Sequence, residues 1–159
     1  MSEPRRIAIV MSRMPRLIDP GSNWLRGLRA GLRRICDRQQ ILLVSPGTAG
    51  SDFVVRGAER MRVSMELATD IAVAEGTADG FAIRDRQLIA QADELLVLSI
   101  RPRGNIHRLL LERLQTPDQK IILVDLPDLQ PPSVRESLLS PGAELWSPDP
   151  ESLRPFVDS

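Results

Sequence analysis

The sequence predicts a single α/β domain, with a parallel sheet of five or more strands and helices on both faces. The chain has 159 residues, of which 42% are hydrophobic, which is enough to form one substantial core. Short apolar runs, typical of strands buried on both faces, alternate with longer segments of helical periodicity. This alternation favours consecutive strands that are joined by helical crossovers and therefore run parallel. Residues 1–147 are assigned to this domain and residues 148–159 to a polar C-terminal tail.

The strands are predicted from their apolar content. The first is the continuous apolar run Ile7–Met11. The third alternates, with Val63, Met65 and Leu67 on one side. The predicted strands span residues 7–11, 41–44, 63–67, 94–100 and 121–124, and an edge strand is also expected at 143–146.

The helices are predicted from apolar stripes on one face. Helices are expected at about 22–37, 82–92 and 133–139, with two further stripes through Val54, Ala58 and Met61 and through Ile106, Leu109, Leu110 and Leu114. The apolar face of the first helix is expected to hold Leu25, Leu28, Leu32, Ile35 and Cys36. Gly27 and Gly31, one turn apart, would let this helix approach a strand closely. Residues 68–82 are compatible with a strand at 70–74 or with a long functional loop.

Composition excludes several classes of function. The 21 basic and 21 acidic residues balance, so any anion site must be local; Lys120 is the only lysine among the basic residues. Cys36 is the only cysteine and His107 the only histidine, so we expect no metal site and no disulfide within the chain. Neither a signal peptide nor a run of 18 apolar residues is visible, so we expect a cytoplasmic protein that does not enter a membrane.

Three strand-to-helix turns carry the residues with the most distinctive chemistry. They are Met11–Arg13, Gly47–Asp52 and Arg101–Asn105. In an open parallel sheet such turns lie at the edge where ligands bind. Their glycines leave room for a ligand, and the helices that follow, with Ser51 and Asn105 as expected N-caps, offer free amides to an anion. The residues predicted to bind a phosphate ligand are Ser12, Arg13, Gly47, Thr48, Gly50, Ser51, Asp52, Arg84, Arg101, Arg103, Gly104 and Asn105.

Three segments carry a resemblance to a known superfamily. They are Ile7–Arg13, Val44–Asp52 and the pair Arg84–Arg86 with Ala92–Asp93. They resemble, in this order, a first strand with a Gly-Ser-Arg turn, a Gly-rich turn ending Gly-x-Asp, and an Arg-Asn-Arg helix followed by an Ala/Ser-Asp strand start. These are features of the Rossmann-like superfamily that contains DNA-processing protein A (SMF) and the LOG proteins. The resemblance covers about residues 7–125 and implies a nucleotide pocket at the strand ends.

Some residues of this chain match the motifs of the superfamily, and others differ from them. Matching positions are Ser12, Arg13, Gly50, Asp52, Arg84 and Gly104. Met11 stands where the family has glycine and would narrow the floor of the pocket. Pro46 replaces another glycine and removes an amide donor. Arg103–Asn105 replaces a Gly-Gly-x-Gly-Thr turn.

The leading hypothesis is a sensing or regulatory module that binds a nucleotide or nucleotide-derived phosphate ligand. It requires no other cofactor, and analogy with such folds suggests a homodimer. The first alternative is a nucleoside-monophosphate phosphoribohydrolase, an N-glycosidase. LOG-type enzymes place a glutamate where this chain has Arg108, which cannot act as a base, and Glu112 is out of register. We therefore lean away from catalysis.

The second alternative is a mediator that binds single-stranded DNA. Aromatic residues make up only 3% of the chain, so platforms for base stacking are scarce. Trp24 and Trp146 are expected to pack in the core, and His107 to be a solvated surface residue. Nucleic acid is therefore a less favoured partner than a small phosphorylated ligand.

Overall fold

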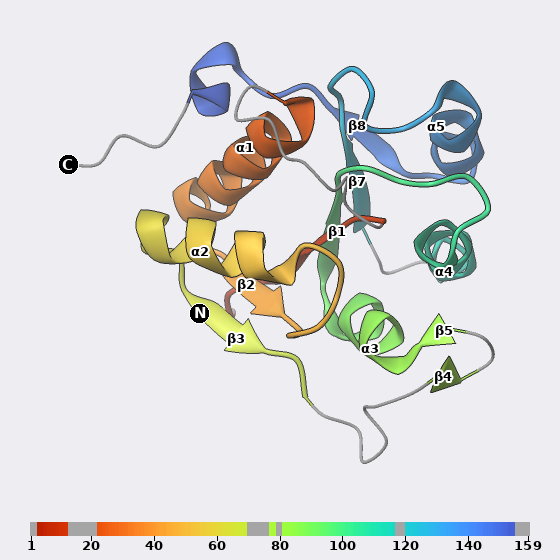
Figure 1. Cartoon of the computed structure of the whole chain (residues 1–159), viewed down its shortest axis with the longest axis horizontal. Coiled ribbons are helices and arrows are strands. Elements are labelled where there is room, and N and C mark those ends of the chain that lie inside the picture. Colours follow the sequence, from red (N-terminus) through yellow and green to blue (C-terminus); the bar gives the residue numbers. More distant parts are fainter. Residues whose placement is uncertain (1–2, 13–21, 70–76, 79–80, 117–119, 155–159) are drawn as a thin grey trace.

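The computed structural model describes residues 3–12, 22–69, 77–78, 81–116 and 120–154. Its main sheet is built from β1 (Arg6–Val10), β2 (Ile41–Val44), β3 (Met65–Leu67), β6 (Glu94–Val97), β7 (Lys120–Val124) and β8 (Glu144–Trp146). These six strands run parallel, in the order β3-β2-β1-β6-β7-β8 (Figure 1). The predicted α/β fold class is confirmed.

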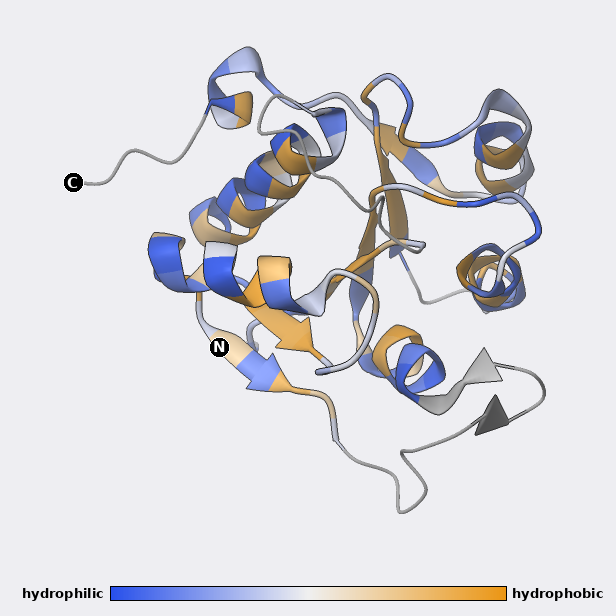
Figure 2. Ribbon diagram, in the orientation of Figure 1, coloured by the Kyte–Doolittle hydropathy of each residue, from blue (hydrophilic) through white to orange (hydrophobic). Residues whose placement is uncertain are grey.

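Helices cover both faces of this sheet. They are α1 (Asn23–Asp37), α2 (Ser51–Met61), α3 (Ile83–Gln91), α4 (Asn105–Arg113) and α5 (Pro132–Leu139). Helices α1 and α2 lie on one face, and α3, α4 and α5 lie on the other (Figure 1). The central strands between them are strongly hydrophobic (Figure 2). Strand pleating divides the core into two layers, because Ile7 and Ile9 pack with α1 and α2 while Ala8 and Val10 pack with α3 and α4.

Helix α1 begins where the sequence predicts. Ser22 is its N-cap, and the Ser22 hydroxyl accepts a hydrogen bond from the Leu25 amide at 3.3 Å. The glycines approach the sheet as expected: a Cβ at Gly27 would lie 3.1 Å from the Leu98 side chain. Cys36 is exposed, so its assignment to the apolar face is wrong. Cys36 lies about 100° around the helix from the buried Ile35, and this rotation carries it off the sheet.

Two predicted strands are shorter in the structure. Strand β3 begins at Met65 instead of Val63, because the Val63 amide bonds back to Ala58 at the end of α2. Strand β6 ends at Val97 instead of Ile100, because the Ile100 amide turns to the carbonyl of Leu129. Since β3 is an edge strand, Leu67 is 65% exposed. The edge strand β8 is confirmed.

The segment 68–82, for which the sequence allows a strand or a long loop, contains a small antiparallel hairpin that the sequence does not predict. It pairs β4 (Thr77–Ala78) with β5 (Phe81–Ala82) directly before α3. The strand considered at 70–74 lies outside the described residues. After β8 the chain forms a 3₁₀ turn, η1 (Pro150–Leu153), whose Glu151 carbonyl accepts a hydrogen bond from Arg33 of α1 at 2.8 Å. No helix in the described part of the chain has the length and apolar character needed to span a membrane.

Candidate functional site

A cavity of about 480 Å³ opens at the carboxyl ends of β1 and β6. These adjacent strands form the switch point of the sheet, because the chain continues from β1 to β2 on one side and places β7 beyond β6 on the other. The cavity is lined by Met11, Ser12, Gly47, Ala49, Gly50, Asp85, Arg101, Gly104, Asn105 and Ile106. All three turns singled out in the sequence therefore contribute to one cavity.

The first and third turns are fastened to each other through Ser12. Its amide donates to the Ser99 carbonyl at 2.7 Å, and its hydroxyl accepts from the Arg101 amide at 2.8 Å. Within the described part of the chain, the Ser12 hydroxyl proton has no acceptor, so it is available to a ligand. Met11, buried beneath, lines the cavity and accepts a hydrogen bond at its sulfur from Trp24, which packs in the core as predicted.

The second turn is closed by its own hydrogen bonds. The Thr48 hydroxyl and amide both donate to the Ser45 carbonyl, at 2.8 and 3.2 Å. Gly47 and Gly50 have φ of 94° and 75°, which a residue with a side chain rarely adopts. The turn therefore presents glycine and alanine backbone to the cavity, and the Thr48 hydroxyl is occupied within the turn.

Two helix N-termini open on the cavity, each capped by a glycine. Gly50 caps α2 and Gly104 caps α4, and neither helix has a side-chain hydrogen bond at its cap. The prediction that Ser51 and Asn105 are the N-caps is wrong by one residue. The Ser51 hydroxyl accepts from the Gly47 amide instead, because the left-handed Gly50 turns the chain into α2 one residue earlier. In α2 the Ser51 amide donates to Thr48 and the Phe53 amide to Gly50, so the Asp52 amide is the one left in that first turn. In α4 no bond within the described residues engages the amides of residues 105–107, and these amides remain for a ligand.

The two arginines of the third turn differ in position. Arg101 is exposed and lines the cavity, and no hydrogen bond or ion pair engages its guanidinium within the described residues. Arg103 has a left-handed φ of 59° and does not line the cavity. Its amide donates to Nδ1 of His107 at 3.2 Å. Gly104 lies close beneath Arg101, since a Cβ there would be 3.3 Å from the Arg101 carbonyl oxygen.

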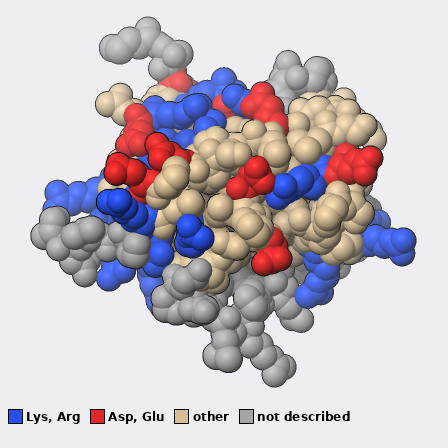
Figure 3. Space-filling view, turned by 90° about the horizontal axis from the view of Figure 1, so that it is seen from above, with Lys and Arg blue, Asp and Glu red and all other residues tan. Residues whose placement is uncertain are grey.

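Helix α3 contributes an arginine and a carboxylate. The Arg84 guanidinium occupies the place that a side chain at Gly47 would need, so Arg84 packs against the second turn. Asp85 lines the cavity, and burial raises the pKa of its carboxyl group. Arg86 pairs with Glu112 of α4 at 3.6 Å. Charged groups of both signs are interspersed on the face shown in Figure 3, in keeping with the balanced composition.

The structure brings half of the predicted site residues to the cavity wall. Six of them line it, namely Ser12, Gly47, Gly50, Arg101, Gly104 and Asn105. Five others belong to neighbouring positions outside that lining, namely Thr48, Ser51, Asp52, Arg84 and Arg103. Arg13 lies outside the described residues. Four lining residues are not among the predicted ligand-binding residues, namely Met11, Ala49, Asp85 and Ile106. Of these, Met11 was expected at the pocket floor from the resemblance, and a signal for Asp85 was present in the Arg84–Arg86 segment.

His107 is buried instead of solvated, which corrects the sequence expectation. The Ser137 hydroxyl donates to the Val134 carbonyl at 2.6 Å, so Nε2 of His107 must donate to Ser137, 2.8 Å away. Nδ1 accepts from the Arg103 amide. These contacts require the neutral Nε2–H tautomer, and burial lowers the pKa of His107 accordingly.

A His107→Asn variant is expected to be about 1 kcal/mol less stable than the wild type at pH 7, through lost hydrogen bonding. This gap should narrow as the pH falls from 7 to 5. The lowered folded-state pKa means that the stabilisation is present above the unfolded pKa of about 6.5 and is lost as pH falls through the folded pKa. Urea unfolding at several pH values measures the gap, and His107 is the only histidine to titrate. A gap independent of pH would contradict the assignment.

No protein-family profile matches the chain, and no curated protein matches it in sequence. Solved structures do match. The molybdenum cofactor carrier protein of Chlamydomonas reinhardtii has a TM-score of 0.64 at 13% identity, with 92% of this chain and 91% of that chain covered.

DNA processing protein A of Streptococcus pneumoniae has a TM-score of 0.59 at 14% identity, with 98% of this chain and 63% of that chain covered. DNA processing protein A of Helicobacter pylori, which binds single-stranded DNA, has a TM-score of 0.56 at 13% identity, with coverage of 89% and 75%. The chain therefore shares the Rossmann-like fold of the molybdenum cofactor carrier protein and DNA processing protein A.

Proposed function

We propose that the cavity binds a nucleotide or nucleotide-derived phosphate ligand and that the protein is a sensing or regulatory module. The observation that carries this proposal is the meeting of two glycine-capped helix N-termini and Arg101 at one cavity. The first amides of a helix lack intrahelical acceptors and carry the positive end of the helix dipole. Such a site favours an anion, and Arg101 adds a planar pair of donors suited to phosphate.

The dimensions and surroundings of the cavity support a small ligand of this class. A volume of about 480 Å³ falls within the range of roughly 300–1,000 Å³ that is typical of ligand pockets. The fold likeness adds support, since one neighbour carries the molybdenum cofactor and another binds single-stranded DNA. The homodimer suggested by analogy stays a prediction that light scattering would test.

Replacing Arg101 with alanine is expected to weaken binding of nucleoside monophosphates about 10- to 100-fold, because one charge-assisted contact to phosphate is worth about 1.5–3 kcal/mol. Calorimetry with a panel of nucleoside monophosphates and inorganic phosphate measures the change. Arg103→Ala is the matched control, since Arg103 is exposed, two residues away and outside the cavity lining. Its affinities should equal those of the wild type.

Two outcomes would count against the proposal. If no member of the panel binds the folded wild-type protein, the cavity is not a phosphate site. If Arg101→Ala and Arg103→Ala weaken binding equally, the anion is held elsewhere on the third turn. Chromatography for released base in the same samples distinguishes binding from N-glycosidase activity, and a gel shift at low salt tests single-stranded DNA.

A further inference from the structure

Asp85 is a carboxylate at the wall of a cavity that is otherwise suited to anions. It lies in the first turn of α3, is half-buried, and lines the cavity together with residues of the second and third turns. Within the described part of the chain, no hydrogen bond or ion pair engages its oxygens. An ionised carboxylate can only accept hydrogen bonds, and leaving it buried without them is unfavourable.

The cavity is lined by a cation and an anion that do not pair with each other in the described part of the chain. Burial raises the pKa of Asp85, and none of the described cations, including Arg101 on the same cavity and Arg84 and Arg86 on its own helix, offsets this effect. Asp85 and Arg101 both line the cavity but form no ion pair with each other in the described part of the chain. With a phosphate at Arg101 and Gly104, the Asp85 carboxylate is left to contact another part of the ligand.

The residues that line the cavity beside Asp85 include apolar side chains. Met11 and Ile106 line the cavity with it, and Ala49 of the second turn does the same. A small adjoining space of about 10 Å³ is bounded by the same residues together with Ile9, Val10, Thr48, Leu88 and Ile89. Apolar side chains beside a carboxylate suit a flat heterocycle, whose faces are apolar and whose edge carries hydrogen-bond donors.

On the basis of the phosphate site proposed above, we infer that the cavity selects ligands whose ring carries two adjacent N–H donors, and that Asp85 accepts both. This edge is found in 2-amino-4-oxo rings, which occur in guanine and in pterins. The two carboxylate oxygens of Asp85 match two parallel N–H groups, as they match an arginine fork. Adenine offers no such pair, and hypoxanthine lacks the amino group.

Calorimetry with four ligands that differ at this edge tests the inference. The wild-type protein should bind GMP at least about 10-fold more tightly than IMP, which lacks one donor, and more tightly than AMP or XMP. Neopterin monophosphate, compared with GMP, distinguishes a pterin from a purine as the source of the edge. In Asp85→Asn the preference should change from GMP to XMP, because the amide replaces one acceptor by a donor that meets the 2-oxo group of xanthine.

The outcomes separate the two proposals. Asp128→Asn is the matched control, because Asp128 is exposed, does not line the cavity and has a left-handed φ of 68°, which asparagine tolerates. It should keep the wild-type order of affinities. Equal, Arg101-dependent binding of GMP, IMP and AMP by the wild type would overturn the role of Asp85 and leave the phosphate site standing. Absence of binding by every phosphorylated ligand would overturn both.

Discussion

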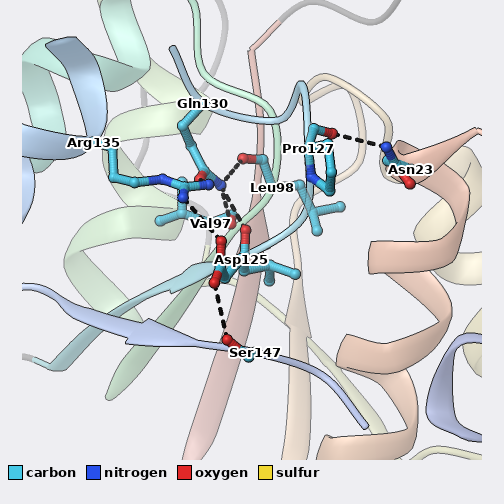
Figure 4. A network of polar contacts seen from close by, with 9 residues as sticks. Asn23, Val97, Leu98, Asp125, Pro127, Gln130, Arg135 and Ser147 are labelled. Carbon is cyan, nitrogen blue, oxygen red and sulfur yellow. Dashed lines mark hydrogen bonds and ion pairs between the residues drawn. The ribbon is translucent and has the colours of Figure 1, made fainter. Parts of the chain in front are cut away.

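Replacing Gln130 with leucine is expected to lower the free energy of unfolding by about 2–4 kcal/mol, the cost of leaving more than one buried polar group without a partner. Gln130 is only 5% exposed. Its amide nitrogen donates to the carbonyls of Leu98 at 2.7 Å, Val124 at 3.0 Å and Val97 at 3.3 Å (Figure 4). Its carbonyl oxygen accepts from Arg135 at 2.9 Å.

The physical reason is that β6 and β7 diverge where Gln130 lies between their ends. Strand β6 ends at Val97 and β7 at Val124, so carbonyls at and beyond these residues lose their neighbours in the sheet. Gln130 supplies the donor to the Leu98 carbonyl and a further donor to the Val124 carbonyl, which also accepts from the Leu126 amide at 3.2 Å. Leucine would fill a similar volume without these donors. The same change is expected to weaken ligand binding, because the segment that it anchors at Leu98 continues directly into Arg101.

Urea unfolding measures the effect, and Ser147→Ala provides the control within the same network. The Ser147 hydroxyl donates to Asp125 at 2.9 Å, and Asp125 in turn accepts from Arg135, but Ser147 is exposed (Figure 4). Water can replace that hydrogen bond, so its loss should cost less than about 1 kcal/mol. Equal costs for the two variants would show that Gln130 does not hold the strand ends.

The second large effect is expected at Gly27, where leucine should destabilise the protein by about 3 kcal/mol through overpacking. A Cβ at Gly27 would already lie 3.1 Å from Leu98, 3.3 Å from Leu129 and 3.4 Å from Leu126. The further carbons of a leucine would meet the same three side chains. These belong to the segments that follow β6 and β7, so the added volume must push α1 away from the sheet.

Gly31→Ala is the matched control on the same face of α1. A Cβ at Gly31 would lie 3.5 Å from Leu96 and 3.7 Å from Ile9, which are ordinary contact distances. Because alanine is a better helix former than glycine by about 0.8–1 kcal/mol, this variant should be as stable as the wild type or more so. Thermal unfolding compares the melting temperatures of the two variants. Equal melting temperatures for Gly27→Leu and Gly31→Ala would refute the close packing at Gly27.

Much of the fold could be predicted from local hydrophobic patterns in the sequence. The apolar runs of β1, β2 and β7 and the stripe of α1 are dictated by burial on one or two faces, and the structure contains them close to the predicted bounds. The hairpin of β4 and β5 was missed because strands of two residues carry too little periodicity to be read. The strand at Met65–Leu67 was predicted to begin earlier, because sequence alternation does not reveal where the chain leaves the preceding helix.

The candidate site was predicted as a set of turns, and the turns do meet. The individual side chains were less predictable: Arg101 and Arg103 look equivalent in sequence, but the left-handed conformation of Arg103 accompanies its position outside the cavity. His107 was expected in solvent, and its burial depends on Ser137 of α5, 30 residues away in the chain. Such distinctions rest on contacts between distant segments.

The sequence by itself determined the alternation of strands and helices, and with it a parallel sheet whose carboxyl edge carries glycine- and arginine-containing turns, because hydrophobic periodicity and turn chemistry are local properties. Only the tertiary structure decided which groups face one another across that edge. The order of strands places β1 beside β6, and so brings Ser12, Gly50, Asp85 and Arg101 to one cavity. Strand order is fixed by the packing of helices on both faces, which sums over the whole chain and leaves no signature in any one segment.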